Sequence, residues 1–195
     1  MPRPDTYAQF QPASRAAWRQ WLAEHHASAP GVWLVYCKKA TGQPSVSYAE
    51  AVEEALCFGW IDSLPRRLDA ARTQLLFTPR QPTSGWSKVN KERLVRLEAA
   101  NRLLPAGRAA IAAARQNGAW ESLDAAEAGA LPGDLAEALA ADAPAQRNYA
   151  AFSLSARKMI LTWVLGARRP ETRARRVAET VRLAAKNKRA NFDRE

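Results

Sequence analysis

The first hundred residues alternate between two patterns of apolar positions, one with helical spacing and one typical of strands. Residues 14–26 place alanine, tryptophan and leucine at i, i+1, i+4 and i+5 after Ser14, a residue type that caps helices. Residues 47–58 repeat the helical spacing, and Ser47 and Glu50 have the spacing of a capping box. This part of the chain therefore predicts two amphipathic helices.

Three short runs between and after these helices are typical of strands. Residues 32–37, VWLVYC, are apolar and rich in β-branched and aromatic side chains, which indicates a buried strand. Residues 59–69 and 72–80 predict the two strands of a hairpin that turns at the sequence DAAR. Pro65 lies in the first of these two strands. Because proline cannot donate a hydrogen bond to a neighbouring strand, we expect this strand at a sheet edge or with a bulge.

Beyond Gly85 only helical spacing remains. The predicted helices cover 87–101, 105–118, 132–142 and 144–152, followed by a helix that Ser155 opens and a last one from Pro170. Residues 119–131 are acidic and resemble a linker. The apolar positions expected to face inward are Val89, Leu94 and Leu97 in the first of these helices, Ala156, Met159, Ile160, Trp163, Val164 and Ala167 in the helix after Ser155, and Val177, Val181 and Ala184 in the last.

These patterns together predict an α+β fold. A small antiparallel β-sheet with helices forms the N-terminal half, and an all-α helical half follows it. The expected domains are residues 1–100 and residues 101–195, with the helical domain packed on the first or continuous with it as one domain. With 195 residues, the chain can bury a core without disulfide or metal crosslinks.

The composition is that of a globular protein, with 47% hydrophobic and 25% charged residues. No apolar run approaches the roughly 20 residues of a membrane span, and the N-terminal sequence lacks the pattern of a secretory signal, so we expect a cytoplasmic protein. Cys37 and Cys57 lack the spacing of a zinc site and are expected to be small buried hydrophobes. The sequence predicts no metal and no cofactor.

Positive charge is concentrated near the C-terminus. The net charge is +10, and residues 155–195 hold twelve lysines and arginines against four acidic residues. This asymmetry is compatible with an anionic partner, such as nucleic acid, and equally with a solvated basic helix. The seven tryptophans leave a similar choice, because exposed ones can build a dimer interface and buried ones belong to a core.

The sequence TPRQPTSGWSKVN, residues 78–90, is the first candidate site. If Ser84 or Ser87 caps the helix that begins near Trp86, the first backbone N–H groups of that helix point outward and attract an anion. Arg80 can bring a guanidinium to the same anion, and Asn90 lies on the same helical face as Ser87. The alternative is a capped junction with Trp86 as a core anchor.

Asp62 adds a possible acid or base to this candidate site. It lies two residues after Trp60, so both side chains point to the same face of a strand. Beside a large apolar ring, the pKa of a carboxyl group can be raised into a catalytic range. The alternative is an ion pair with Arg66, Arg67 or Arg80. The hypothesis is that Cys57 lines one pocket together with the predicted ligand-binding residues, which are Trp60, Asp62, Arg80, Ser84, Trp86, Ser87 and Asn90. This hypothesis requires a cavity between Trp60 and Trp86.

Several blocks of this sequence resemble a bacterial family described as YdeI/OmpD-associated, or bacteriocin-protection. The blocks are YAEAVEEALCFGWIDS, FTPRQPTSGWSKVN, LPAG, NGAW, LSARKMILTWV and ARRPETRARR, and they arrive in the family's order from about Trp18 to Arg176. The resemblance implies a role in stress or antimicrobial-peptide tolerance and does not imply a reaction.

Three hypotheses about function follow. The first is a cofactor-free binding protein that holds a small anionic molecule near Arg80 and residues 84–90. The second is nucleic-acid binding through the basic C-terminal helices, where Glu171 and Arg173 can instead join helix to helix. The arginines that would contact phosphates in this second case are Arg168, Arg169, Arg173 and Arg176. The third is an enzyme that uses Asp62 or Cys57.

Overall fold

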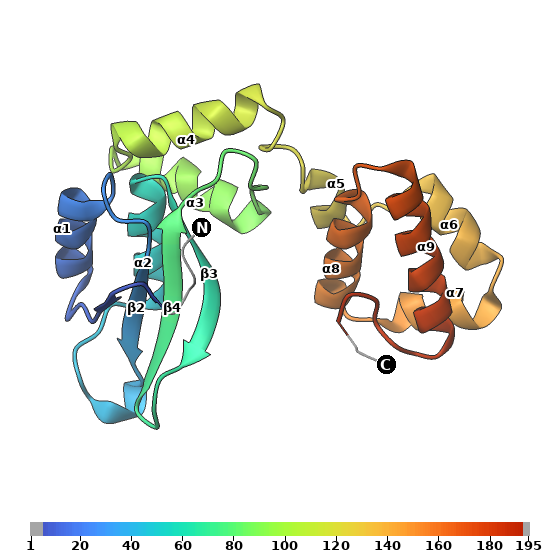
Figure 1. The fold of residues 1–195 in the computed structure, drawn as a ribbon, viewed down its shortest axis with the longest axis horizontal. Coiled ribbons are helices and arrows are strands. Elements are labelled where there is room, and N and C mark those ends of the chain that lie inside the picture. Colours follow the sequence, from blue (N-terminus) through green and yellow to red (C-terminus); the bar gives the residue numbers. More distant parts are fainter. Residues whose placement is uncertain (1–5, 193–195) are drawn as a thin grey trace. The chain divides into compact units, whose positions relative to one another are not determined.

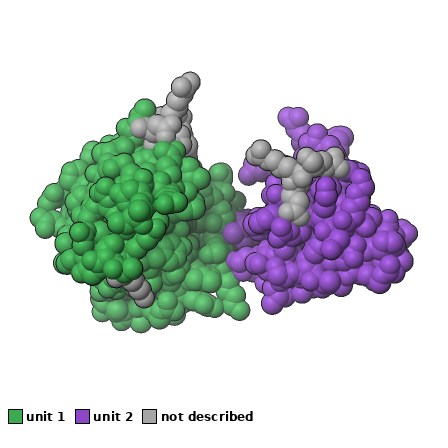
Figure 2. Space-filling view, turned by 90° about the horizontal axis from the view of Figure 1, so that it is seen from below, with its two compact units in different colours: residues 1–121 green, residues 122–195 purple. Residues whose placement is uncertain are grey.

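The computed structural model describes residues 6–192, which form two units divided in sequence between Glu121 and Ser122 (Figure 2). Each unit has its own hydrophobic core. The fold is α+β, with the strands in the N-terminal part and helices dominating the C-terminal half, which confirms the predicted fold class (Figure 1). The division at residue 121 lies later than the expected boundary at residue 100, because one more helix packs on the first unit.

The first unit contains a four-stranded sheet in the order β1-β2-β4-β3. Its strands and helices, in chain order, are β1 (Gln9–Phe10), α1 (Arg15–His25), β2 (Val32–Cys37), the short 3-10 helix η2 (Lys39–Thr41), α2 (Tyr48–Cys57), β3 (Trp60–Arg67), β4 (Arg72–Pro79), α3 (Lys88–Ala99) and α4 (Pro105–Gln116). The strands β2, β4 and β3 are antiparallel, as predicted, and the two-residue β1 adds a parallel edge beside β2.

The strand β3 has both features that its proline predicted. It lies at the edge of the sheet, and its pairing with β4 is interrupted by a bulge between Asp62 and Pro65. Asp62 pairs with Phe77 and Pro65 with Leu75, so the two residues of β3 between these pairs stand opposite one residue of β4, and β3 has one additional residue. The bulge bends this edge strand and leaves the residues around it open to a cavity.

Serine side chains begin the helices of the first unit. Ser14 accepts a hydrogen bond from the N–H of Ala17 at the start of α1. Ser47 and Glu50 form the complete capping box of α2. Ser87 caps α3, which decides between the two serines that the sequence offered for this helix. The predicted caps of α1 and α2 are therefore confirmed.

The first core lies between the sheet and its helices. Val32, Leu34 and Phe77 from the strands are almost fully buried, together with Trp18 from α1 and Leu56 from α2. The helices α1 and α2 lie side by side along the sheet (Figure 1).

The helix α4 belongs to the first unit because it packs closely against the end of α2. The N–H of Leu104 donates to the carbonyl oxygen of Cys57 at 3.2 Å. Gly107 then approaches so closely that an added Cβ atom would lie 2.6 Å from the same oxygen. Only glycine permits this contact without a shift of the backbone.

A buried charge cluster joins α1, α2 and the turn after α3. Glu54 is fully buried, and its carboxylate accepts hydrogen bonds from Arg15 Nε at 2.5 Å and Arg19 Nη1 at 2.6 Å. Arg102 donates to the same carboxylate. Since a buried carboxylate is tolerated only with such partners, Glu54 fixes the relative positions of three segments of the chain.

The second unit is entirely helical within its described residues. Its helices are α5 (Asp124–Glu127), α6 (Gly133–Ala140), α7 (Ala143–Ala151), α8 (Leu154–Leu165) and α9 (Pro170–Ala185). The short helix α5 lies inside the segment that resembled a linker. The core of the second unit includes Leu135, Tyr149, Ile160, Val164 and Leu183.

The start of α8 differs from the prediction. Ser153, not Ser155, caps this helix, and its hydroxyl accepts a hydrogen bond from the N–H of Ala156 at 3.3 Å. Met159 was expected in the core and is 39% exposed. Ala156, Ile160 and Val164 follow one another at intervals of four, and Met159 lies about 100° away from that stripe.

The same geometry corrects one position in α3. Val89 is 50% exposed, although the sequence predicted it to face inward. The buried residues of α3 are Asn90, Leu94 and Leu97, at intervals of four and three. Val89 is one residue off this stripe, so its side chain points toward solvent. Within residues 6–192, no helix is both long enough and apolar enough to cross a membrane.

Candidate functional site

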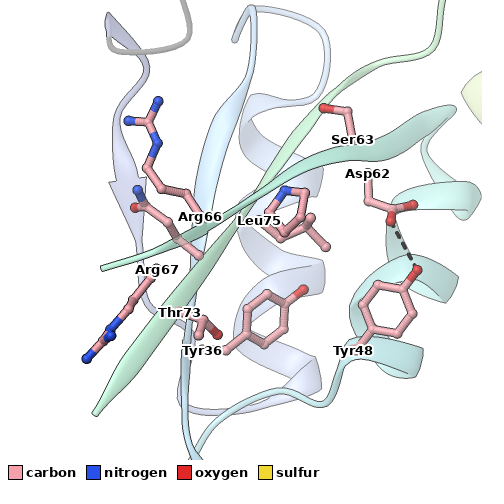
Figure 3. A pocket seen from close by; sticks show the side chains of 10 residues that line it. Tyr36, Tyr48, Asp62, Ser63, Arg66, Arg67, Thr73 and Leu75 are labelled. Carbon is pink, nitrogen blue, oxygen red and sulfur yellow. Dashed lines mark hydrogen bonds between the residues drawn. The ribbon is translucent and has the colours of Figure 1, made fainter. Parts of the chain in front are cut away.

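A pocket in the first unit opens beside the bulge of β3, between the sheet and the start of α2 (Figure 3). Its volume is about 640 Å³, within the usual range of small-molecule sites. Residues from β2, α2, β3 and β4 line it: Tyr36, Tyr48, Asp62, Ser63, Pro65, Arg66, Arg67, Thr73, Gln74 and Leu75.

The local folding of each element explains why these side chains meet. In β2, Tyr36 follows Val32 and Leu34 at intervals of two, so it lies on the face of the sheet that carries the core. Tyr36 stands opposite Thr73 in β4. Tyr48 is the first residue of α2, and the capping box at Ser47 holds that end of the helix in place. Asp62 comes from the β3 residues just before the bulge.

One end of the pocket is formed by two tyrosines and a carboxylate (Figure 3). The hydroxyl of Tyr48 donates a hydrogen bond to Asp62 Oδ2 at 3.0 Å. The hydroxyl of Tyr36 is buried and has no hydrogen-bond partner in the described part of the chain. Burial raises the pKa of Tyr36 and of Tyr48, and the charge of Asp62 raises both further. Both hydroxyls are therefore protonated at neutral pH and can donate hydrogen bonds.

The opposite end of the pocket is basic through Arg67, which stands opposite Thr73 in β4 and extends away from Asp62 (Figure 3). The guanidinium of Arg66 lies over the ring of Trp33, 4.7 Å from the ring centre, on the face of the sheet that Tyr36 does not share. Arg67 Nε donates to the carbonyl oxygen of Asp69 at 3.3 Å. Gln74 Oε1 is buried in the pocket wall and has no hydrogen-bond partner among residues 6–192. The pocket thus has an acidic end and a basic end.

The segment TPRQPTSGWSKVN forms a braced turn outside this pocket. The guanidinium of Arg80 lies 3.6 Å from the centre of the Trp86 ring and donates to the carbonyl oxygens of Ser84 and Gly85. Burial lowers the pKa of Arg80 to about 10, although Asp62 acts in the opposite direction. Arg80 remains charged at neutral pH. Its Nη2 bonds the turn, whereas its Nε and Nη1 are buried and have no hydrogen-bond partner among the described residues.

Trp60, Ser87 and Asn90 also have structural contacts of their own. Trp60 is 1% exposed, and its Nε1 donates to the carbonyl oxygen of His26 at 3.1 Å. Ser87 caps α3 through the N–H of Asn90. The side chain of Asn90 accepts a hydrogen bond from Arg93 at 2.8 Å. Of the seven residues predicted to bind a ligand, Asp62 is the one that lines the pocket.

The interaction of Asp62 is not the ion pair with Arg66, Arg67 or Arg80 that the sequence offered as the alternative. The hydrogen bond that Asp62 makes within the described chain comes from Tyr48. The bulge between Asp62 and Pro65 separates Asp62 from the arginines that follow in β3. Its carboxylate is consequently directed to the tyrosine end of the pocket.

Cys57 has the environment of a buried structural thiol. Its side chain is fully buried, and burial raises the pKa of the thiol, as does the charge of Glu54, while Arg19 acts in the opposite direction. A raised pKa keeps the sulfur protonated at neutral pH, which opposes the nucleophile hypothesis for this residue. Cys37 is partly buried, and its sulfur contacts Gln43 and Gln11.

Two of the four C-terminal arginines have contacts within the second unit. Arg173 forms a two-pronged ion pair with Asp134 of α6, which joins α9 to that helix. Arg176 donates to the carbonyl oxygen of Trp163 and lies over its ring. The predicted helix-to-helix role of Arg173 is therefore real, with Asp134 rather than Glu171 as its partner. The side chains of Arg168 and Arg169 are exposed.

Sequence reasoning missed most of the residues that line the pocket. The interval of two along VWLVYC was sufficient to place Tyr36 on the core face. Tyr48 directly follows the predicted capping serine. Neither pattern indicates that the two tyrosines and Asp62 converge, because that depends on the register of β3 and β4 and on the bulge.

These features define a two-unit α+β protein with a polar, ligand-sized pocket in its first unit. Residues 10–110 match the model of a family described as a domain of unknown function (DUF8412). Residues 129–187 match the model described as "Bacteriocin-protection, YdeI or OmpD-Associated". The chain therefore belongs to this domain family of unknown function, whose model covers more than half of it, and its second unit contains a YdeI/OmpD-associated domain at residues 129–187.

The second match confirms the resemblance to the YdeI/OmpD-associated family, but only over residues 129–187. The blocks before residue 121 were expected to belong to the same family as ARRPETRARR, whereas the two units match separate models. No curated protein and no solved structure matches the chain.

Proposed function

We propose that this protein binds a small organic anion that also carries a hydrogen-bond donor, in the pocket of the first unit. The observation that carries the proposal is the hydroxyl of Tyr36. It is buried in the pocket wall, is protonated at neutral pH and lacks a hydrogen-bond partner among the described residues. A buried polar group left without a partner costs about 1–3 kcal/mol. A ligand that accepts a hydrogen bond from Tyr36 recovers that cost.

The two ends of the pocket set the chemistry of the ligand. Asp62 favours a donor such as a hydroxyl or ammonium group. Arg67 favours a carboxylate or phosphate at the opposite end. Leu75 and Pro65 provide an apolar surface between the two ends. In this proposal Arg80 holds the turn before α3 and does not contact the ligand.

The family description connects the second unit with bacteriocin protection. We include in the proposal that binding of this small anion serves tolerance to stress or to antimicrobial peptides. The cytoplasmic location of the protein stays a prediction.

The direct test is calorimetric titration with small anions that also carry a donor, namely glutamate, 4-hydroxyphenylacetate and glycerol 3-phosphate. We expect at least one of them to bind, and Tyr36→Phe to weaken its binding about five- to tenfold, the value of one hydrogen bond of about 1–1.5 kcal/mol. The matched control is Tyr7→Phe, which removes a tyrosine hydroxyl of the first unit that lies outside the pocket lining.

The outcomes separate the hypotheses. Equal affinities of the wild type and Tyr36→Phe, or equal losses in Tyr36→Phe and Tyr7→Phe, would contradict the proposal. A short DNA duplex serves as a further ligand. Binding of DNA alone, abolished in an Arg168→Glu, Arg169→Glu double variant, would favour the nucleic-acid alternative.

A further inference from the structure

The second unit contains a pocket of its own, lined by residues of α5, α6, α7 and the first turns of α8. Its volume is about 650 Å³. This pocket shares no residue with the pocket of the first unit. It lies in the part of the chain that folds around the second hydrophobic core.

Two buried polar atoms in this pocket lack a protein partner within residues 6–192. One is the hydroxyl of Tyr149, whose residue is only 4% exposed, and the other is Nε of Arg157. Both residues line the pocket. Burial raises the pKa of Tyr149 to about 12, although Arg157 acts in the opposite direction. Tyr149 is therefore a hydrogen-bond donor at neutral pH, and so is Arg157 Nε. Two donors that converge on one cavity require an acceptor.

The electrostatics of the pocket favour an anionic acceptor. Lys158 also lines the pocket, but its Nζ forms an ion pair with Glu127 at 2.5 Å, so these two charges largely offset each other. Arg157 then supplies the net positive charge. The N-terminal end of α8 begins at Leu154 in the same wall, and its helix dipole adds positive potential there.

The rest of the pocket is apolar and extends to the surface. Leu139 and Leu161 are almost fully buried in its wall. Leu131 and Leu154 also line it and are 45% and 77% exposed, so they form an apolar rim. A small inorganic anion would make no contact with this apolar surface. A chain of methylene groups attached to the anion would cover it.

We infer that the second unit binds a small single-chain amphiphile, with its anionic head between Tyr149 and Arg157 and its alkyl chain along Leu131 and Leu154. This site is distinct from the ligand pocket proposed above and does not depend on it. The shared chemistry of its ligands is one negative charge on a short alkyl chain. Carboxylate and phosphate heads both satisfy it.

The test is an NMR titration of the full chain with octanoate, followed through the Nε–H resonance of Arg157. Acetate supplies the head without the chain, and octanol supplies the chain without the head. Octyl phosphate distinguishes the two possible head groups. We expect octanoate or octyl phosphate to bind at least tenfold more tightly than acetate and octanol.

Two variants probe the two donors. We expect Arg157→Gln to weaken binding about tenfold or more, since hydrogen bonds from charged groups are the stronger ones. Tyr149→Phe should weaken binding about fivefold and at the same time leave the melting temperature of the unliganded protein equal or higher, because it removes a buried hydroxyl that lacks a partner. A purely structural role of Tyr149 would instead lower that temperature.

The matched control is Arg147→Gln, which removes an exposed charge from α7 outside the pocket lining. It should not change octanoate binding by more than twofold. The inference is overturned if Tyr149→Phe binds octanoate as the wild type does, or if acetate or octanol binds as tightly as octanoate. A similar loss in Arg147→Gln would also overturn it, since binding would then depend on overall charge.

Discussion

Replacement of Glu54 by glutamine is expected to destabilise the first unit strongly. The carboxylate of Glu54 is fully buried and accepts hydrogen bonds from Arg15, Arg19 and Arg102. Glutamine has nearly the same volume, so the substitution creates no large cavity. It removes the negative charge that three guanidinium groups share and places an amide NH₂ group among donors.

The magnitude follows from the burial of the partners. Removing one partner of a buried ion pair costs about 3–5 kcal/mol. The side chains of Arg15, Arg19 and Arg102 are 27%, 32% and 37% exposed, so water can partly solvate them after the substitution. Glu53 also remains 3.0 Å from Arg15. We therefore expect a loss of about 3 kcal/mol in the free energy of unfolding, at the lower end of that range.

The assay is urea unfolding followed by tryptophan fluorescence. Six of the seven tryptophans lie before residue 121, so this signal reports mainly on the first unit. Glu98→Gln is the matched control, because Glu98 pairs with Arg108 and both side chains are 50% exposed. That exposed pair should contribute about 0–1 kcal/mol. If Glu54→Gln lowers the free energy of unfolding no more than Glu98→Gln does, the buried cluster does not stabilise the first unit more than an exposed ion pair would.

Three further substitutions test contacts elsewhere in the fold. Gly107→Ala should lower the free energy of unfolding of the first unit by about 1–3 kcal/mol, seen as a lower urea midpoint, because its Cβ would lie 2.6 Å from a backbone oxygen of α2. An unchanged midpoint would mean that α4 can move away. Ser153→Ala should lower the free energy of unfolding of the second unit by about 1 kcal/mol, measured by circular dichroism, and Ser155→Ala should lower it by much less. The reverse order would identify Ser155 as the cap. Arg173 holds the pKa of Asp134 below its ordinary value, so the pair adds stability at neutral pH that is lost as the pH falls through that lowered pKa. Asp134→Asn should cost at most about 1 kcal/mol at pH 7, since the pair is partly exposed, and should reduce the loss of stability below about pH 4; an unchanged acid profile would contradict this assignment.

Local signals in the sequence were sufficient to predict much of the secondary structure. The capping box at Ser47 and Glu50, the strand VWLVYC and the start of α4 at Pro105 all follow from contacts between residues close in sequence. Pro65 indicated both the edge position and the bulge of β3. The error at Met159 arose because its apolar neighbour Ile160 takes the buried position, and the error at Val89 because the polar side chain of Asn90 is buried in its place.

Most residues of the pocket in the first unit could not be predicted from these local signals. The residues of TPRQPTSGWSKVN were chosen because they lie close together in sequence, and in the structure their side chains mostly stabilise a turn. The pocket instead combines Tyr36, Tyr48 and Asp62 from separate elements. Asp62 was found because its strand position and charge are visible in the sequence. The tyrosines required the sheet register as well.

The sequence by itself determined the fold class, the serine caps of α1 and α2 and the hairpin of β3 and β4, because backbone propensity and periodicity act over a few residues. The tertiary structure decided that α4 belongs to the first unit, that Glu54 collects three arginines, and that Tyr36 and Tyr149 each face a cavity with an unsatisfied hydroxyl. These features depend on pairs of residues far apart in the chain. Their energies arise only when packing brings such residues into contact and removes water from around them.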